Sequence, residues 1–149
     1  MRIAIVSDER HPLHDVILAW CKERGLQVEV FGAIAENRDV PWADAAESAA
    51  LAVATGACDE GLFFCWTGTG ICMAANKVAG IRAALVWDAG GAAGARVWNH
   101  ANVLCLSNRY CSDALGKEIL EAWFSTDPGE KGREGVDRML ALEERHRRK

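Results

Sequence analysis

The stretch EGLFFCWTGTGICMAANKVAG, residues 60–80, decides the fold. Its first seven residues are a short apolar run of the kind found in buried strands. The alternating glycines of residues 67–70 follow, and then small and apolar residues with helical spacing lead to Gly80. The stretch therefore predicts a β-strand that turns sharply into an α-helix, with Cys65 at the turn.

The same strand-to-helix pattern recurs on both sides, about five times in all. Further strands are predicted at 2–7, 27–32, 81–87 and 102–107, and helices at 14–25, 42–56, 89–101, 112–125 and from 133 to the end. This alternation predicts one α/β domain over residues 1–149, with a doubly wound parallel sheet and helices on both faces. Ligands of such folds bind beyond the carboxyl ends of the strands, which points to SDER (7–10), CWTGTG (65–70), WDAGG (87–91) and SNRY (107–110).

The composition is that of an ordinary soluble globular protein. Of 149 residues, 50% are hydrophobic and 26% are charged, with a net charge of −4. This balance excludes a nucleic-acid-binding polycation. No segment approaches the roughly 18 apolar residues of a membrane span. The opening MRIAIVSDER is typical of a first strand and not of a signal peptide. We therefore expect a cytoplasmic protein with no nucleic-acid or membrane partner.

The six cysteines argue against a zinc site and against disulfides. No two of them form a C-x-x-C pair, and the chain has only four histidines. Without a secretion signal, disulfides are not expected either. Most of the cysteines are interpreted as small buried hydrophobic residues. Cys65 is the exception, because it stands directly before the glycine loop.

The loop of residues 67–70 has two interpretations. Successive amide N–H groups at a helix N-terminus can hold a phosphate or a developing oxyanion, and they stabilise the thiolate of a cysteine within reach. Alternatively, the loop is only a tight turn beside a buried cysteine. A dinucleotide fingerprint is disfavoured because Met73 stands where its third glycine belongs, and no P-loop motif is present.

The loop and the residues after it, together with a second motif further along the chain, resemble a known family. CWTGTGICMAANKVAGIRAAL (65–85) with NHANVLCLSNR (99–109) resembles the ribose-5-phosphate isomerase B family, which includes the galactose-6-phosphate isomerase subunits. The opening RIAIVSD is similar as well. The resemblance implies a Rossmann-like three-layer sandwich with a five-stranded parallel sheet and a C-terminal helix. It also implies aldose–ketose isomerisation of a sugar phosphate without cofactor or metal, in a homodimer or a tetramer with shared active sites.

The resemblance assigns a catalytic set. Cys65 would be the base that moves a proton between C1 and C2 of the sugar. The backbone amides of Gly68, Thr69 and Gly70 would stabilise the enediolate oxygen. Thr67 would move a proton between the sugar oxygens. Asp8 and Asn99 would touch the sugar or assist ring opening.

The resemblance also assigns the phosphate contacts. Arg109 and Arg133 match arginines that hold the phosphate, for which a guanidinium fork is suited. The family's paired C-terminal arginines act on the neighbouring subunit's site. In this chain that pair is Arg133 and Arg138, whose spacing does not match the family pattern cleanly.

Several departures from the family pattern fall at ring opening. Trp98 replaces the histidine linked to that step, and His100 is two positions away, which on a helix turns a side chain by about 200°. Trp66 replaces the glycine after the cysteine, and Val40 replaces a tyrosine. We expect Trp66 and Trp98 to line the pocket, although packing is the alternative for any single tryptophan.

A further departure falls at the phosphate. Glu9 stands where the family has a histidine that faces the phosphate. A glutamate would repel a dianion there unless Arg10 or His11 turns inward.

Two functions therefore remain open. The first is an isomerase of this family with an altered sugar preference, supported by the retained Cys65 and glycine loop. The alternative is a non-catalytic sugar-phosphate-binding subunit, supported by the missing histidines. A redox or nucleotide-binding domain has only the fold class in its favour.

Overall fold

The computed structural model describes residues 1–147 and has five strands and seven helices there. The strands are β1 (Arg2–Ser7), β2 (Gln27–Phe31), β3 (Glu60–Cys65), β4 (Ala83–Leu85) and β5 (Val103–Ser107). The helices are α1 (Pro12–Glu23), α2 (Gly32–Glu36), α3 (Trp42–Ala54), α4 (Thr69–Ala75), α5 (Ala89–Asn99), α6 (Asp113–Ser125) and α7 (Arg133–His146).

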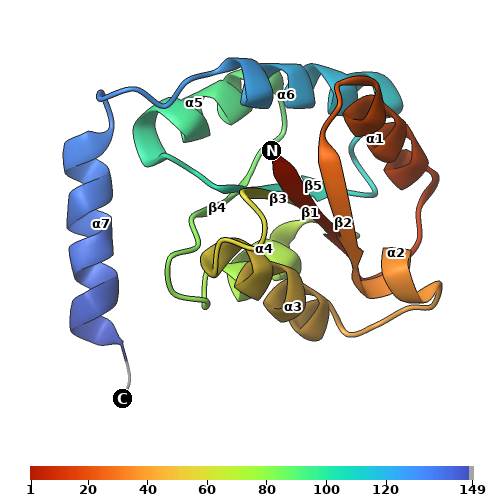
Figure 1. Cartoon of the computed structure of the whole chain (residues 1–149), viewed down its shortest axis with the longest axis horizontal. Coiled ribbons are helices and arrows are strands. Elements are labelled where there is room, and N and C mark those ends of the chain that lie inside the picture. The colour runs from red at the N-terminus through yellow and green to blue at the C-terminus, as the bar shows by residue number, and fades with distance from the viewer. Residues whose placement is uncertain (148–149) are drawn as a thin grey trace.

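The five strands form one parallel sheet in the order β2-β1-β3-β5-β4. Helices α1, α5 and α6 lie on one side of the sheet, and α3 and α4 on the other (Figure 1). The predicted Rossmann-like three-layer sandwich is therefore confirmed. From β1 the chain winds outward to β2 and then returns to β3 on the other side of β1, so the topological switch point lies between β1 and β3.

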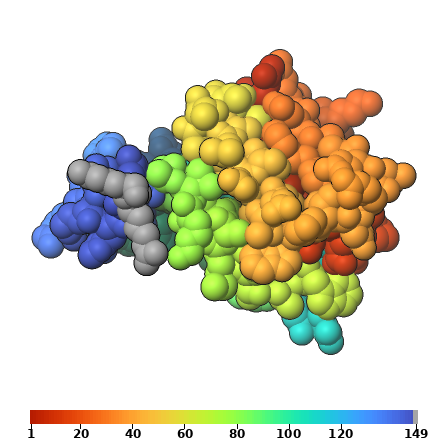
Figure 2. Space-filling model, turned by 90° about the horizontal axis from the view of Figure 1, so that it is seen from below, coloured from red at the N-terminus to blue at the C-terminus, as the bar shows by residue number. Residues whose placement is uncertain are grey.

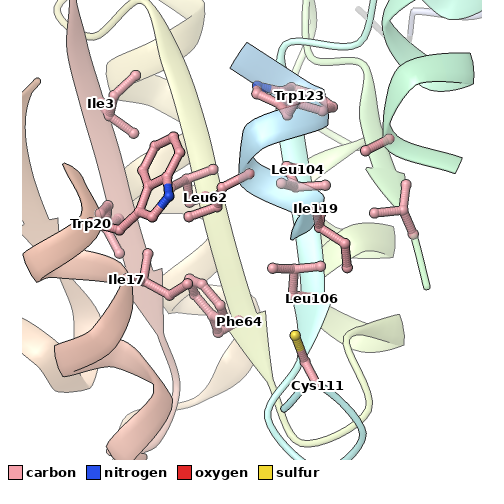
Figure 3. Packing of buried hydrophobic residues seen from close by; sticks show 14 of the residues in the cluster. Ile3, Ile17, Trp20, Leu62, Phe64, Leu104, Leu106, Cys111, Ile119 and Trp123 are labelled. Atoms are coloured by element: carbon pink, nitrogen blue, oxygen red, sulfur yellow. The ribbon is translucent and has the colours of Figure 1, made fainter. Parts of the chain in front are cut away.

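The core has two layers because alternate residues of each strand point to opposite faces. On the first face, Ile3, Leu62, Phe64, Leu104 and Leu106 pack against Ile17 and Trp20 of α1 and Ile119 and Trp123 of α6 (Figure 3). On the second face, the strands pack against the buried alanines of α3. All six residues of β3 are buried, as expected for a central parallel strand covered on both sides.

Some element boundaries differ from the prediction. The strand expected at 81–87 is only Ala83–Leu85, the three residues that pair with Val103–Cys105 of β5. The side-chain amide of Asn76 forms two hydrogen bonds of 2.9 Å with the backbone of Ala83. It accepts the Ala83 N–H and donates to the Ala83 carbonyl oxygen. The short helix α2 was not predicted. The last predicted helix ends at His146, and its final positions, 148 and 149, lie outside the described residues.

Helix α7 is attached to the rest of the domain at its two ends. At its start, Gly132 packs against the backbone carbonyls of Val97 and Trp98 at the end of α5. In its last turns, the Glu143 carboxylate accepts the Gly80 N–H at 3.1 and 3.2 Å. In Figures 1 and 2 the helix lies to one side of the domain, beside the segment around residues 76–84. Among residues 1–147, no helix has both the length and the apolar character that crossing a membrane requires.

Candidate active site

The thiol of Cys65 lies at the carboxyl end of β3, at the switch point of the sheet. The side chain is buried, with 5% of its surface exposed. The turn that follows depends on Gly68, which has a φ of 78°. A Cβ there would lie 2.6 Å from Cδ1 of Leu85 and 3.1 Å from the backbone carbonyl carbon of Leu106. Only glycine therefore fits this position, because both the backbone conformation and the space exclude a side chain.

Helix α4 begins directly after Gly68, at Thr69. The first amide N–H groups of a helix have no acceptor within the helix, so those of α4 are available at this turn. The hydroxyls of Thr67 and Thr69 are 2.7 Å apart and hydrogen-bonded. From α3, the indole of Trp42 lies beside Gly70, 3.2 Å from where a Cβ of that glycine would be. The turn thus places two hydroxyls and free backbone amides next to the Cys65 segment.

The segment after β5 is joined to this turn through backbone hydrogen bonds. The N–H of Asn108 donates to the carbonyl oxygen of Cys65 over 2.9 Å, and the N–H of Arg109 donates to that of Trp66 over 3.0 Å. The Ser107 hydroxyl also donates to the Trp66 carbonyl oxygen, over 2.7 Å. These contacts hold the two post-strand segments together as one unit.

An exposed cation and two exposed aromatic rings gather on this unit. The Arg109 guanidinium lies 5.8 Å from the ring centre of Trp66 and 5.2 Å from that of Tyr110. Tyr110 in turn contacts the Trp87 ring edge-on at 5.9 Å. Within residues 1–147, Arg109 has no salt bridge. Its charge is therefore available to an anion, and Trp66 stands half exposed beside it.

The segment after β1 supplies carboxylates. Burial raises the pKa of Asp8, and the neighbouring charge of Glu9 raises it further. Oδ1 of Asp8 is buried without a hydrogen-bond partner among the described residues. The Arg10 guanidinium does not turn toward Glu9. It lies 3.6 Å from Asp15 and 3.5 Å from the carbonyl oxygen of Ile34.

His11 is occupied elsewhere as well. It is the N-cap of α1, and its Nδ1 accepts the N–H of Leu13 at 3.2 Å. Neither residue that could compensate the charge of Glu9 pairs with it.

A buried pair of residues that the sequence did not predict lies next to Glu9, and one of its members donates a hydrogen bond to the Glu9 carboxylate. Nε2 of His14 is 2.8 Å from Oδ1 of Asn108, and both residues are at most 2% exposed. Burial lowers the pKa of His14 to about 4. The available signals were a histidine on the apolar face of the helix that contains Leu13 and Ile17, and an asparagine directly after a buried strand.

The remaining predicted residues lie near the amino ends of the strands, whereas Cys65 lies at their carboxyl ends. Helix α5 runs back from the carboxyl edge, so Trp98 and Asn99 come just before β5 begins at Val103. Cys65 pairs with Ser107 at the far end of that strand, about 13 Å away along it. One chain therefore does not bring Trp98 or Asn99 to its own Cys65.

Arg133 and Arg138 belong to the same distant region, because α7 starts against the end of α5. Both side chains are exposed, and each is paired with a neighbour on its own segment, Glu130 at 3.4 Å and Glu134 at 2.7 Å. A groove of about 980 Å³ separates α7 from the β4 edge, and Asn99 lines it. We call the region of Trp98, Asn99, Arg133 and Arg138 the second cluster.

Within residues 1–147, no group of three or more histidine, cysteine or acidic side chains is arranged to hold a metal ion. All six cysteines are free thiols.

The chain is similar to known proteins along almost its whole length. Residues 3–139 match the model of a family described as Ribose/Galactose Isomerase. The chain is 32% identical to Ribose-5-P isomerase B of Listeria innocua, over 99% of this chain and all of that protein. It is 34% identical to D-erythrulose-4-phosphate isomerase of Pectobacterium atrosepticum, over 85% of this chain and 84% of that one. The solved structure of ribose-5-phosphate isomerase B from Clostridium thermocellum superposes with a TM-score of 0.88 at 34% identity, covering 99% of this chain and 100% of that one.

Proposed function

The chain belongs to the ribose/galactose isomerase family, and we propose that it interconverts an aldose phosphate and its ketose isomer. The observation that carries this proposal is the placement of Cys65 at the switch point of the sheet. The thiol stands at the turn into α4, where Gly68 leaves the backbone amides open. Two relatives named for different sugars, ribose 5-phosphate and erythrulose 4-phosphate, share about a third of their residues with this chain.

The proposed chemistry is a proton transfer between two neighbouring carbons. The Cys65 thiolate takes the proton from C2 of the open-chain aldose, and the electron pair moves through C1–C2 onto the carbonyl oxygen. The resulting enediolate is protonated at C1 by the same thiol, which yields the ketose. Aldose and ketose are isomers, so no oxidant or reductant takes part.

The turn into α4 supports the charge of the enediolate. The amides of Gly68, Thr69 and Gly70 stabilise a developing oxyanion without reorganising during the step, because the backbone is already fixed. The hydroxyl of Thr67, paired with that of Thr69 at 2.7 Å, moves the proton between the two sugar oxygens.

We propose that Arg109 binds the phosphate of the substrate. It is the exposed cation on the segment joined to Cys65, and Trp66 and Tyr110 flank it. Trp66 is a large, half-exposed side chain beside Arg109, so the sugar preference is expected to differ from that of relatives with a small residue there. An aromatic face at this position suits the C–H surface of a sugar.

We further propose that the active site is shared between two copies of this chain. The second cluster lies near the amino ends of the strands and Cys65 lies at their carboxyl ends. A single chain therefore has half of the proposed active-site residues at each end of the sheet. In a two-fold dimer the second cluster of one copy can face Cys65 of the other, because the same contact is made twice. Asn99, Trp98, Arg133 and Arg138 would then complete the partner's site.

Deuterium incorporation from D₂O tests the chemistry. Four- to six-carbon aldoses and ketoses, each with and without phosphate, are incubated with the wild type, Cys65→Ala and Cys58→Ser. Cys58 is a matched control, since it is a buried free thiol just before β3, near the other edge of the sheet. Label next to the carbonyl with wild type and Cys58→Ser, but not with Cys65→Ala, is the expected result.

The alternative is a sugar-phosphate-binding subunit without catalysis. The observation in its favour is Trp98 at the position of the family's ring-opening histidine. Saturable binding of a sugar phosphate without any exchange of label would favour this function over the isomerase.

A further inference from the structure

Asn108 connects the proposed base to a carboxylate of the site. Its backbone N–H donates to the carbonyl oxygen of Cys65 over 2.9 Å. Its side-chain Nδ2 donates to Oε1 of Glu9 over 3.2 Å and to the hydroxyl oxygen of Ser7 over 3.3 Å. One buried residue thereby links the ends of β1, β3 and β5.

The orientation of the Asn108 amide is fixed by His14. Nδ1 of His14 accepts the backbone N–H of His11 at 3.3 Å, so in the neutral ring the proton is on Nε2. Nε2 therefore donates to Oδ1 of Asn108, and the NH₂ group of the amide must point toward Glu9. If His14 did not donate, the amide could turn over and present its oxygen to the carboxylate.

The Glu9 carboxylate has no cation to balance it within residues 1–147. Arg10 is directed to Asp15 and to the Ile34 carbonyl, and no salt bridge of Glu9 is formed. The residue directly before Glu9, Asp8, carries a second carboxyl group. By contrast, the post-β5 side of the site has the cation of Arg109. The site is therefore acidic on its β1 side and cationic on its β5 side.

We propose that Glu9 is a specificity-determining residue that accepts hydrogen bonds from substrate hydroxyls and excludes a phosphate from the β1 side, and that Asn108 and His14 are the positioning residues that hold it there. This inference rests on the proposed function, whose substrate it orients. The hydroxyl-bearing end of the substrate lies at Glu9, and the phosphate lies at Arg109. A carboxylate accepts hydroxyl donors well and repels a dianion, so a single residue provides both effects.

The charge of Glu9 is tested with two small probes, inorganic phosphate and the neutral polyol ribitol. Binding is followed through the amide chemical shifts of Gly68 and Asn108. In Glu9→Gln, phosphate is expected to bind about tenfold more tightly and ribitol several-fold more weakly than in wild type. Glu118→Gln is the matched control, because it removes the same charge from an exposed position on α6. Equal phosphate affinity in Glu9→Gln and Glu118→Gln would overturn the proposal.

The positioning role is tested by removing and restoring the donor at residue 14. His14→Leu removes it and is expected to shift the phosphate-to-ribitol affinity ratio toward that of Glu9→Gln. His14→Gln restores an N–H at the position of Nε2 and is expected to return the ratio to the wild-type value. If His14→Leu does not fold, Asn108→Ser removes the donor to Glu9 instead, with the same expected shift. A wild-type ratio in the donor-free variant would contradict the role of the pair.

These binding measurements fail independently of the exchange experiment. If Glu9→Gln alters the affinities for phosphate and ribitol but the wild type exchanges no deuterium, the isomerase activity is contradicted and the role of Glu9 is supported. If the wild type exchanges deuterium but Glu9→Gln does not alter these affinities, the role of Glu9 is contradicted and the isomerase activity is supported.

Discussion

The imidazole of His14 donates from Nε2 to Oδ1 of Asn108 over 2.8 Å, inside the core and against the ring of Phe64. Burial keeps the ring neutral, with a pKa of about 4 against the usual 6.5. The unfolded chain therefore binds a proton at His14 that the folded protein does not, and stability falls as the pH drops from about 6.5 toward 4. A difference of this size corresponds to about 3 kcal/mol.

The first prediction follows from this linkage. His14→Gln keeps the hydrogen bond but cannot titrate, so its free energy of unfolding should fall less than that of wild type between pH 7 and pH 4. Urea unfolding at pH 7, 5.5 and 4 measures the difference. His146→Gln, on the last turn of α7, is the control. Parallel stability curves for wild type and His14→Gln would show that His14 does not carry the linkage.

A second prediction concerns the turn into α4. Gly68→Ala introduces a Cβ at a φ of 78°, 2.6 Å from Leu85, so we expect a loss of at least about 2 kcal/mol and of most of the activity. Gly94→Ala is the matched control: in α5 a Cβ at this residue meets nothing within 4 Å. It should be neutral or stabilise the protein by up to about 1 kcal/mol. Similar unfolding midpoints for the two variants would show that the turn tolerates a side chain at residue 68.

The third prediction concerns the buried ion pair of Glu60 and Arg96. Their charged groups are 2.7 Å apart, and Trp123 Nε1 donates to the second carboxylate oxygen, also over 2.7 Å. Burial raises the pKa of Glu60, while Arg96 opposes this effect. Arg96→Met leaves the carboxylate buried without its partner, so the free energy of unfolding should fall by about 3 kcal/mol.

Urea unfolding at neutral pH measures this loss. The exposed pair of Arg38 and Glu36 is the comparison, and Arg38→Ala should cost less than about 1 kcal/mol. A loss for Arg96→Met as small as that for Arg38→Ala would mean that the buried pair adds nothing.

The fourth prediction tests the shared site. Cys65→Ala and the double variant Arg133→Ala/Arg138→Ala should each have low activity. Co-expressed, they form mixed dimers in which one site has both intact halves and the other has neither. Because half of the dimers are mixed and one of their two sites is intact, about a quarter of the wild-type activity should return. At equal total protein, activity no higher than the mean of the two separate variants would place the whole site within one chain.

Local sequence determined the elements and the position of Cys65 at a turn between a strand and a helix. The period-2 and period-3.6 patterns predicted all five strands and six of the seven helices, because they record which face of each element is buried. Cys65 and the loop of residues 67–70 were singled out correctly as a post-strand turn, since the conformation of Gly68 is a local demand of the backbone. The length of β4 was missed because it is set by which residues pair with β5, and pairing between strands is not a local property.

The sequence by itself determined that this protein is an alternating α/β chain with a cysteine before an open backbone turn. Only the tertiary structure decided which residues share that turn. The strand order places β1, β3 and β5 side by side, which joins Glu9, His14 and Asn108 to Cys65 although they are distant in sequence. The same topology sends α5 back across the sheet and places Trp98 and Asn99 at the opposite edge. Strand order and register arise from burial over the whole chain, so no local pattern contains them.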